Sequence, residues 1–248
     1  MVIEFDILNN NEQDLRLTNN ILLEKNIKVA DFVFFLAFDV GGYKYLSTQQ
    51  YGFEFIHNNI RLQSNVFELL KFYGKKFLFT STQMSAIRYL PYGTLKIVGE
   101  HYTQALQGIY VRLWNVYGKE NNDEKAHVIT DFIRMAKKDG NIKMITDGSE
   151  ERQFLYVSDC VNCLYILAEL YDEIPRKAPL HITSFTWVSI KTIAETISKI
   201  YNNVPIVAGA YFNDVQIHNK NEPEQFILKY WQPSINVQQG IESIIYST

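Results

Sequence analysis

Short apolar runs alternate along the chain with longer segments that have helical periodicity. A continuous apolar run is typical of a strand buried on both faces of a parallel sheet, whereas apolar residues three and four apart predict an amphipathic helix. Strands are predicted at residues 2–7, 32–37, 76–79, 109–113, 142–145 and 154–157. Helices are predicted at residues 18–26, 55–73, 92–106, 128–138, 157–170 and 190–200, with a further closing helix near the C-terminus.

This order of strands and helices predicts an α/β fold built on a doubly wound parallel sheet. The alternation becomes less regular beyond Gly118, where shorter strands and polar turns follow. Ser158 or Asp159 is expected to cap the helix that follows strand 154–157, and Ser189 is expected to cap the helix that ends at residue 200.

Composition and charge narrow the class of protein. Apolar residues make up 47% of the 248 residues, which is ample for a core, and the net charge of −3 gives no reason to expect nucleic acid or an acidic membrane as a partner. No apolar run is long enough to span a membrane, and the first residues do not resemble a signal peptide. A cytoplasmic, soluble, globular protein is therefore expected.

The chain has two cysteines, Cys160 and Cys163, in Cys-x-x-Cys spacing. This spacing occurs in metal and redox sites, but here it falls inside an apolar helical pattern with no second pair of ligands. A buried structural role is expected, and no metal site is predicted.

Candidate acid/base chemistry lies where strand 76–79 runs into three hydroxyl residues at 80–82. If Pro91 opens a helix, Tyr92 and Lys96 lie one turn apart on the same face. A nearby ammonium favours the phenolate, so the tyrosine is expected to exchange a proton below its usual pKa, and the Thr82 hydroxyl could share that proton. Such a unit suits oxidation of an alcohol or reduction of a ketone. About one Tyr-x-x-x-Lys pair is expected by chance in a chain of this composition. The prediction of acid/base chemistry therefore depends on the position of the pair, which follows a buried strand and three hydroxyl residues and lies at the start of a helix.

Several further blocks of sequence occur in a fixed order around this unit. They are Leu36-Ala37 at a strand end, Asn59 to Asn65 on a helix, Thr80-Ser81-Thr82, Tyr92 with Lys96, Arg112 to Gly118, Asp147-Gly148 with Arg152, Tyr156 to Asp159, and Trp231 with Pro233. In types and order they resemble the NAD-dependent nucleotide-sugar epimerase/dehydratase family of the extended short-chain dehydrogenase/reductases. The resemblance covers nearly the whole chain.

The resemblance implies roles for the acid/base unit and for a substrate site. Tyr92 would be the acid/base, Lys96 its electrostatic partner and ribose ligand, and Thr82 the hydroxyl that contacts the sugar. Asn115 and Arg152 would hold a nucleotide-sugar, and the planar guanidinium of Arg152 suits diphosphate oxygens. Without the resemblance, Asn115 can also be interpreted as a turn former and Arg152 as a surface arginine.

The resemblance also implies NAD as the cofactor. Asp6 would bind the adenosine ribose hydroxyls, which favours NAD over NADP, although Asp6 alone reads equally as a turn residue at a strand end. Asp14 and Leu15 would flank the adenine, Leu36 and Ala37 would pass under the cofactor, and Tyr92 and Lys96 would reach its nicotinamide ribose. On this reading residues 1–118 form a Rossmann-like cofactor domain, to which later segments return, and residues 119–248 form mainly a smaller C-terminal α/β substrate lobe.

Three departures from the family pattern refine the expectation. The glycine-rich turn that holds the cofactor pyrophosphate does not occur, so the Rossmann-like domain is expected to be N-terminally truncated. Thr82 is followed by Gln83 and Met84 instead of the Asp-Glu pair of sugar dehydratases, which argues against dehydration. Only ten positions separate Thr82 from Tyr92, which suggests an open site or an unusual substrate.

The sequence thus predicts an NAD-dependent nucleotide-sugar epimerase or 4-keto reductase. The alternative is a catalytically inactive truncated member of the family, or a nucleotide-sugar-binding protein that does not bind NAD. By resemblance, the helices around Asn59 and Tyr92 would pair in a homodimer, with compatible apolar positions at Ile60, Val66, Leu69 and Ile97.

Overall fold

The computed structural model describes residues 2–87, 89–120, 122, 124–177, 180–210 and 221–246. The chain divides into two compact units, each described by itself below. Unit 1 contains residues 1–40, 46–112 and 164–180, and unit 2 contains residues 41–45, 113–163 and 181–248. The sequence-based division near residue 118 stays a prediction.

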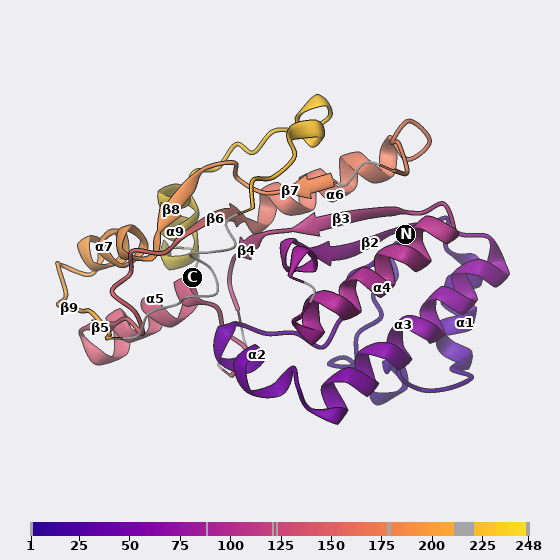
Figure 1. Cartoon of the computed structure of the whole chain (residues 1–248), viewed down its shortest axis with the longest axis horizontal. Helices are drawn as coiled ribbons and strands as arrows, with labels where there is room; N and C mark the ends of the chain where they lie inside the picture. The colour runs from indigo at the N-terminus through magenta and orange to yellow at the C-terminus, as the bar shows by residue number, and fades with distance from the viewer. Residues whose placement is uncertain are drawn as a thin grey trace. The chain divides into compact units, whose positions relative to one another are not determined.

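A four-stranded parallel sheet in the order β1-β2-β3-β7 confirms the predicted α/β fold. Figure 1 labels β2, β3 and β7 of this sheet. Its strands are β1 (Phe32–Phe35), β2 (Lys76–Thr82), β3 (Ile109–Leu113) and β7 (Leu180–Ile182). β1 and β2 are parallel, with Phe32 opposite Lys76 and Phe35 opposite Phe79. β2 extends three residues beyond the predicted apolar run, so its last residues are buried hydroxyl side chains.

Helices of unit 1 pack on one another and on β2. They include α1 (Ile21–Val29), α3 (Phe53–Tyr73) and α4 (Pro91–Ala105), and short 3₁₀ turns lie at Asn11–Gln13 and Gln83–Ala86. α4 packs on β2, α3 on α4, and α1 on α3 (Figure 1). α3 ends at Gly74, whose φ of +58° is the left-handed conformation that glycine adopts without a steric penalty. α2 (Tyr43–Gln49) precedes α3 in the chain.

The predicted strand at residues 2–7 is wrong. These residues form no strand, and the Asp6 carboxylate accepts a hydrogen bond from the backbone NH of Leu8 at 2.9 Å, as in an Asx turn. Val2, Ile3, Ile7 and Leu8 are all exposed. Phe5 packs partly against the core of unit 1. Local turn chemistry decides the conformation of this segment, because most of its apolar side chains are exposed.

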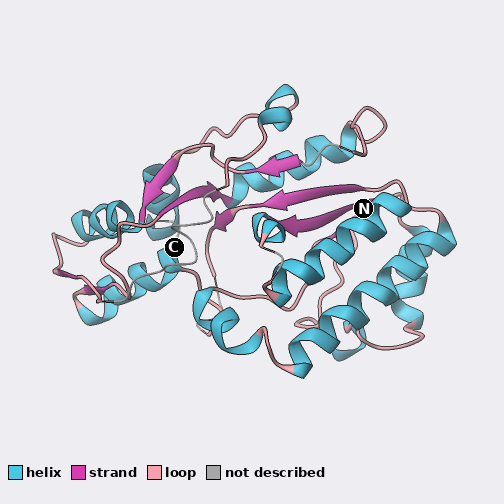
Figure 2. Cartoon of the chain, in the orientation of Figure 1, coloured by secondary structure: helices cyan, strands magenta, loops and turns pink. Residues whose placement is uncertain are grey.

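Unit 2 contains a three-stranded sheet, β4-β6-β8, and a two-stranded parallel sheet, β5-β9 (Figure 2). β4 is parallel to β6, and β8 is antiparallel to β6. The strands are β4 (Asn115–Tyr117), β5 (Ile142–Lys143), β6 (Glu151–Tyr156), β8 (Trp187–Ser189) and β9 (Ile206–Val207). Further helices among the described residues are α5 (Val128–Asp139), α6 (Val157–Glu169), α7 (Ile190–Ile200), the 3₁₀ turn Gln225–Lys229 and α9 (Val237–Tyr246).

The two predicted helix caps have different outcomes. Ser189 caps α7, and its side chain accepts from the backbone NH of Thr192 at 3.0 Å. The predicted cap of α6 is wrong, because that helix already begins at Val157 and Asp159 lies in its first turn. The Asp159 carboxylate accepts instead from the backbone NH groups of Ser234 and Ile235, both at 2.8 Å. Asp159, which the sequence suggested as a helix cap, therefore binds the backbone of a segment that is distant in the sequence.

Cys160 and Cys163 lie on α6 and are buried, as predicted. Burial raises the pKa of the Cys160 thiol to about 12 and raises that of Cys163 as well, so both thiols are protonated at neutral pH. Within the ranges that the structure describes, no helix is long and apolar enough to cross a membrane.

The close approach of α4 to β2 depends on Gly99. A Cβ atom at this position would lie 2.3 Å from the Phe79 ring and 2.5 Å from the Gln63 side-chain oxygen. Phe79 and Gln63 are both buried, so neither can move aside freely.

We expect Gly99→Ala to destabilise the protein by about 1–3 kcal/mol, because the added methyl group overpacks a filled interior. Urea unfolding of the variant and the wild type measures the change. Combining it with Phe79→Leu should cost less than the sum of the two single changes, since the shorter side chain makes room for the methyl group. Strict additivity of the two changes would contradict this account of the packing.

Candidate active site

The predicted acid/base residues meet where the carboxyl end of β2 faces the amino end of α4. Pro91 is the first residue of α4, as predicted, because its fixed φ suits that position and it has no NH to leave unpaired. Tyr92 and Lys96 therefore lie one turn apart on this helix. Thr82 ends β2 and is buried.

Tyr92 and Thr82 are hydrogen-bonded through their side chains. Thr82 Oγ1 also accepts from the backbone NH of Met84 at 3.2 Å, which leaves the threonine hydroxyl proton for the phenol oxygen. Burial raises the pKa of Tyr92 to about 12, and the hydrogen bond from Thr82 opposes that rise. The expectation of a lowered tyrosine pKa is wrong for this protein, because loss of water around the phenol outweighs the neighbouring groups.

Lys96 is only 3% exposed, and its ammonium is held by backbone and by aromatic rings. Nζ donates to the Thr80 carbonyl at 2.6 Å and lies 4.0 Å from the ring centre of Phe38 and 5.0 Å from that of Phe79. Burial lowers the pKa of Lys96 to about 7, against the opposing charge of Glu100. The charge of Lys96 therefore changes near neutral pH.

A partly buried ion pair, which the sequence reasoning missed, supports the same strand end. Glu100 accepts from Arg112 Nε at 2.9 Å and from Nη2 at 2.8 Å, a bidentate pair, and also accepts from the Ser81 hydroxyl at 2.5 Å. Glu100 lies one turn after Lys96, so the spacing of Tyr92, Lys96 and Glu100, each four residues apart, was the available signal.

Residues suggested for the adenosine end of a cofactor lie in the irregular segment before α1. The Asp6 backbone NH donates to the Gln13 side chain at 2.8 Å. The Asp14 carboxylate pairs with Arg16 at 2.8 Å, and the side-chain hydrogen bond from Arg16 lowers the pKa of Asp14. The Leu15 carbonyl accepts from the Asn65 amide at 2.8 Å. Asp14 is thus engaged within the protein, while its proposed part at the adenine stays a prediction.

Leu36 and Ala37 directly follow β1, and both are exposed at the carboxyl end of that strand. The Thr80 hydroxyl lies 3.4 Å from the carbonyl oxygens of Phe35 and Leu36, which joins the ends of β1 and β2. In open α/β sheets, ligands bind outside the carboxyl ends of the strands. This edge of unit 1 therefore has the position that a cofactor site requires.

Asn115 and Arg152, suggested for the substrate, both belong to the three-stranded sheet of unit 2. Asn115 begins β4 and lies opposite Phe154 of β6, and Arg152 lies on β6 opposite Val188. Arg152 Nη1 donates to the Glu151 carbonyl at 2.6 Å. Burial lowers the pKa of Arg152, which leaves a partly desolvated cation suited to an anionic partner.

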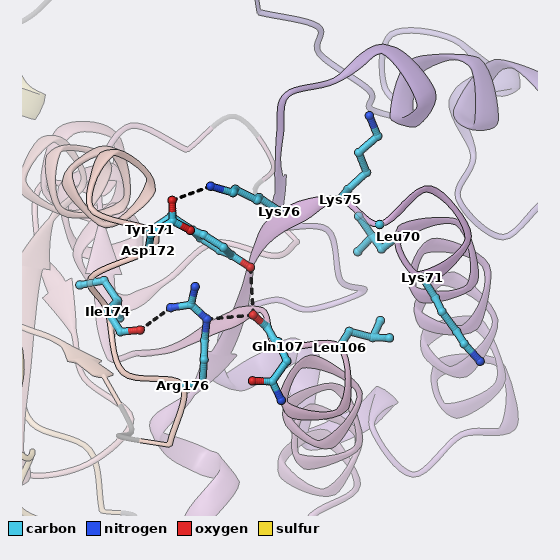
Figure 3. Close-up of a pocket in the computed structure, with 11 residues that line it drawn as sticks. Leu70, Lys71, Lys75, Lys76, Leu106, Gln107, Tyr171, Asp172, Ile174 and Arg176 are labelled. Atoms are coloured by element: carbon cyan, nitrogen blue, oxygen red, sulfur yellow. Dashed lines mark hydrogen bonds and ion pairs between the residues drawn. The ribbon is translucent and has the colours of Figure 1, made fainter.

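Unit 1 has a hollow of about 520 Å³, and its polar side chains bind backbone carbonyls near the ends of helices (Figure 3). It lies around Lys76, at the end of β2 away from Thr82, where several helices end. Figure 3 shows Tyr171 and Arg176 converging on the Gln107 carbonyl, at 3.0 and 2.8 Å. Lys75 binds two carbonyls at the end of α1, both at 2.8 Å. These cations complete the carbonyl ends of helices.

Comparisons with known proteins agree with this geometry. The model of the "NAD dependent epimerase/dehydratase family" matches residues 4–182. UDP-N-acetyl-alpha-D-glucosaminuronate decarboxylase from Bacillus cytotoxicus is 30% identical over 57% of this chain and 47% of its own length. UDP-glucuronic acid decarboxylase 3 from Arabidopsis thaliana is 26% identical over 52% of this chain and 37% of its own. The chain thus spans less than half the length of these curated relatives.

Solved structures show the same fold. UDP-glucose 4-epimerase from Thermotoga maritima, solved with UDP-glucose, superposes with a TM-score of 0.78 at 17% identity, over 94% of this chain and 81% of that one. The Bordetella bronchiseptica enzyme WbmF, in complex with NADH, gives a TM-score of 0.77 at 21% identity, over 94% of this chain and 75% of that one. With the family match over most of its length, this chain belongs to the NAD-dependent epimerase/dehydratase family.

Proposed function

We propose that this chain carries the acid/base centre of an NAD-dependent nucleotide-sugar epimerase or 4-keto reductase that acts at a sugar hydroxyl. The observation that carries the proposal is the hydrogen bond between Thr82 and Tyr92, with the buried ammonium of Lys96 one helical turn further along. The three groups stand at the carboxyl end of β2, where α/β proteins bind their ligands.

The residues at this edge suit the nicotinamide ribose of a dinucleotide, whereas the glycine-rich turn that would hold its pyrophosphate does not occur in this sequence. The donors of Lys96 and Tyr92 suit ribose hydroxyls, and the exposed Leu36 and Ala37 offer apolar surface at the end of β1. We assign Asp6, Asp14 and Leu15 to the adenosine end. When bound, NAD would accept a hydride from the sugar carbon and return it.

The protein groups move and hold the proton. At pH 7 Tyr92 is a neutral phenol, since its pKa is about 12, and it is ready to donate a proton to a ketone oxygen. In the oxidising direction, a phenolate at Tyr92 takes the alcohol proton, and the Thr82 hydroxyl and the Lys96 charge stabilise that phenolate. Thr82 therefore serves as the hydroxyl that contacts both the phenol and the sugar oxygen.

A UDP-sugar is the substrate class we propose. The curated relatives carry UDP-sugars in their names. Arg152 would bind the diphosphate, since a partly desolvated guanidinium gains most from an anion, and Asn115 would hydrogen-bond the same ligand.

We further propose a homodimer formed through α3 and α4. Ile60 on α3 and Val98 and Tyr102 on α4 are 50%, 41% and 42% exposed, so both helices present apolar surface. Of the positions suggested by the sequence, Val66 is wrong, because it is 3% exposed and packs in the core of unit 1. Leu69 packs partly against the same core.

We expect Tyr92→Phe to lower turnover by about 10²–10⁴-fold, because the general acid/base is lost. The substrate is whichever nucleotide-sugar the wild-type protein converts. Turnover is measured after screening UDP-sugars with added NAD. Tyr246→Phe, at an exposed tyrosine of α9, is the matched control and should keep wild-type turnover. Full turnover by Tyr92→Phe would exclude the assignment.

NAD affinity should be highest below pH 7. The pKa of Lys96 is lowered to about 7, so its ammonium is present below that pH and is lost as the pH rises through it. If the ammonium binds the ribose, Kd should rise by up to about tenfold per pH unit above 7. Calorimetric titration from pH 6 to 9 measures this, and Lys96→Met should bind weakly with no such slope.

The same titration separates the enzyme from the alternative function. Binding of NAD by the wild type supports the enzyme. Failure to bind at millimolar NAD, with a nucleotide-sugar still bound, would favour a binding protein that works without the cofactor.

A further inference from the structure

Lys96 is a buried cation, and Glu100, the carboxylate whose charge acts on it, is already hydrogen-bonded to other groups. Glu100 lies one turn further along α4, but Arg112 and the Ser81 hydroxyl bind its oxygens. Glu100 acts on Lys96 through its negative charge, which opposes the effect of burial. The Thr80 carbonyl accepts a hydrogen bond from Lys96 but carries no full charge. A buried ammonium needs further compensation.

The ring of Phe38 supplies it. Its centre lies 4.0 Å from Lys96 Nζ, well inside the range of about 6 Å over which a ring face attracts a cation. Phe79 lies further away, at 5.0 Å. Because the site is desolvated, the attraction is stronger than it would be at an exposed surface.

The same ring also contacts Tyr92. The ring centres of Phe38 and Tyr92 are 5.7 Å apart with an interplanar angle of 70°, an edge-to-face pair. Phe38 thus touches both members of the proposed acid/base pair, although it lies 54 residues before Tyr92 in the chain.

Two contacts fix Phe38 in place. Its ring packs against the buried Phe55 of α3, with centres 6.5 Å apart. The next residue, Asp39, is clamped by the buried Asn59 side chain, which accepts from the Asp39 NH at 2.8 Å and donates to the Asp39 carbonyl at 3.2 Å. The segment after β1 is therefore anchored by α3, and it carries Phe38 to the lysine.

We propose that Phe38 is a positioning residue that holds the Lys96 ammonium beside Tyr92 through a cation–π contact, a role that rests on the proposed function of that pair. On α4, Glu100 acts on Lys96 through its charge, and the titratable Tyr92 lies one turn before the lysine. From the segment after β1, the Phe38 ring attracts the ammonium without offering an anion that would compete for it.

Fluorinated phenylalanines at position 38 test the role with little change of shape. Each added fluorine weakens the negative face of the ring, so the pKa of Lys96 should fall stepwise, by about one unit in total. NMR titration of lysine labelled at Cε follows this pKa directly, and Lys96→Arg assigns the signal by removing it. An unchanged Lys96 pKa across the fluorinated series would overturn the proposal.

Conventional variants give a second, independent series. Phe38→Leu should lower the Lys96 pKa by about one unit, and Phe38→Tyr should keep it, because the tyrosine ring also attracts cations. Phe53→Leu, at an exposed ring that stacks on His57 at the start of α3, is the matched control and should leave the pKa unchanged. A lowered pKa in the control, or none in Phe38→Leu, would contradict the role.

NAD titration distinguishes this inference from the function on which it rests. If Phe38 acts as proposed, Phe38→Leu should weaken NAD binding and shift the fall in affinity to lower pH by the same amount as the Lys96 pKa. Tighter NAD binding by Phe38→Leu would overturn the proposal, because the ring would then be an obstacle over the lysine. If the wild type binds no NAD but fluorination still lowers the Lys96 pKa, the proposed function fails and the cation–π contact stands.

Discussion

Burial of the Lys96 ammonium against the end of β2 is the constraint on which the site depends. A cation with 3% exposure is tolerated only where its surroundings replace water. The Thr80 carbonyl does so at 2.6 Å and the Phe38 ring at 4.0 Å. The strand end, the first turns of α4 and the segment after β1 must therefore keep fixed distances, which also sets Tyr92 beside Thr82.

Polar residues inside the buried end of β2 are explained by the same arrangement. Each of the three hydroxyl side chains lies near a different partner: Thr80 reaches the end of β1, Ser81 binds Glu100, and Thr82 binds Tyr92. Because buried hydroxyls are tolerated when they are hydrogen-bonded, the strand continues through them. Gly99 then lets α4 approach closely enough for these bonds to form.

Motif residues of this family serve the fold as well as any chemistry. Asn59 clamps the backbone after Phe38, and Asp159 holds the backbone of residues 234 and 235. Arg112 pairs with Glu100. The retained blocks of sequence are thus consistent with a preserved scaffold, while the chemistry proposed above depends on a smaller set, namely Thr82, Tyr92 and Lys96.

The sequence by itself determined the strands and helices with continuous apolar or strongly periodic patterns, the helix start at Pro91, and the placement of Tyr92 and Lys96 one turn apart, because these depend on local spacing. It failed at residues 2–7, where most of the apolar side chains are exposed, and at Asp159, whose partners lie 75 and 76 residues away. Only the tertiary structure decided the raised pKa of Tyr92, the Glu100–Arg112 pair and the contact of Phe38 with Lys96. Burial and through-space charge depend on which distant segments pack together, and one-dimensional spacing does not contain that information.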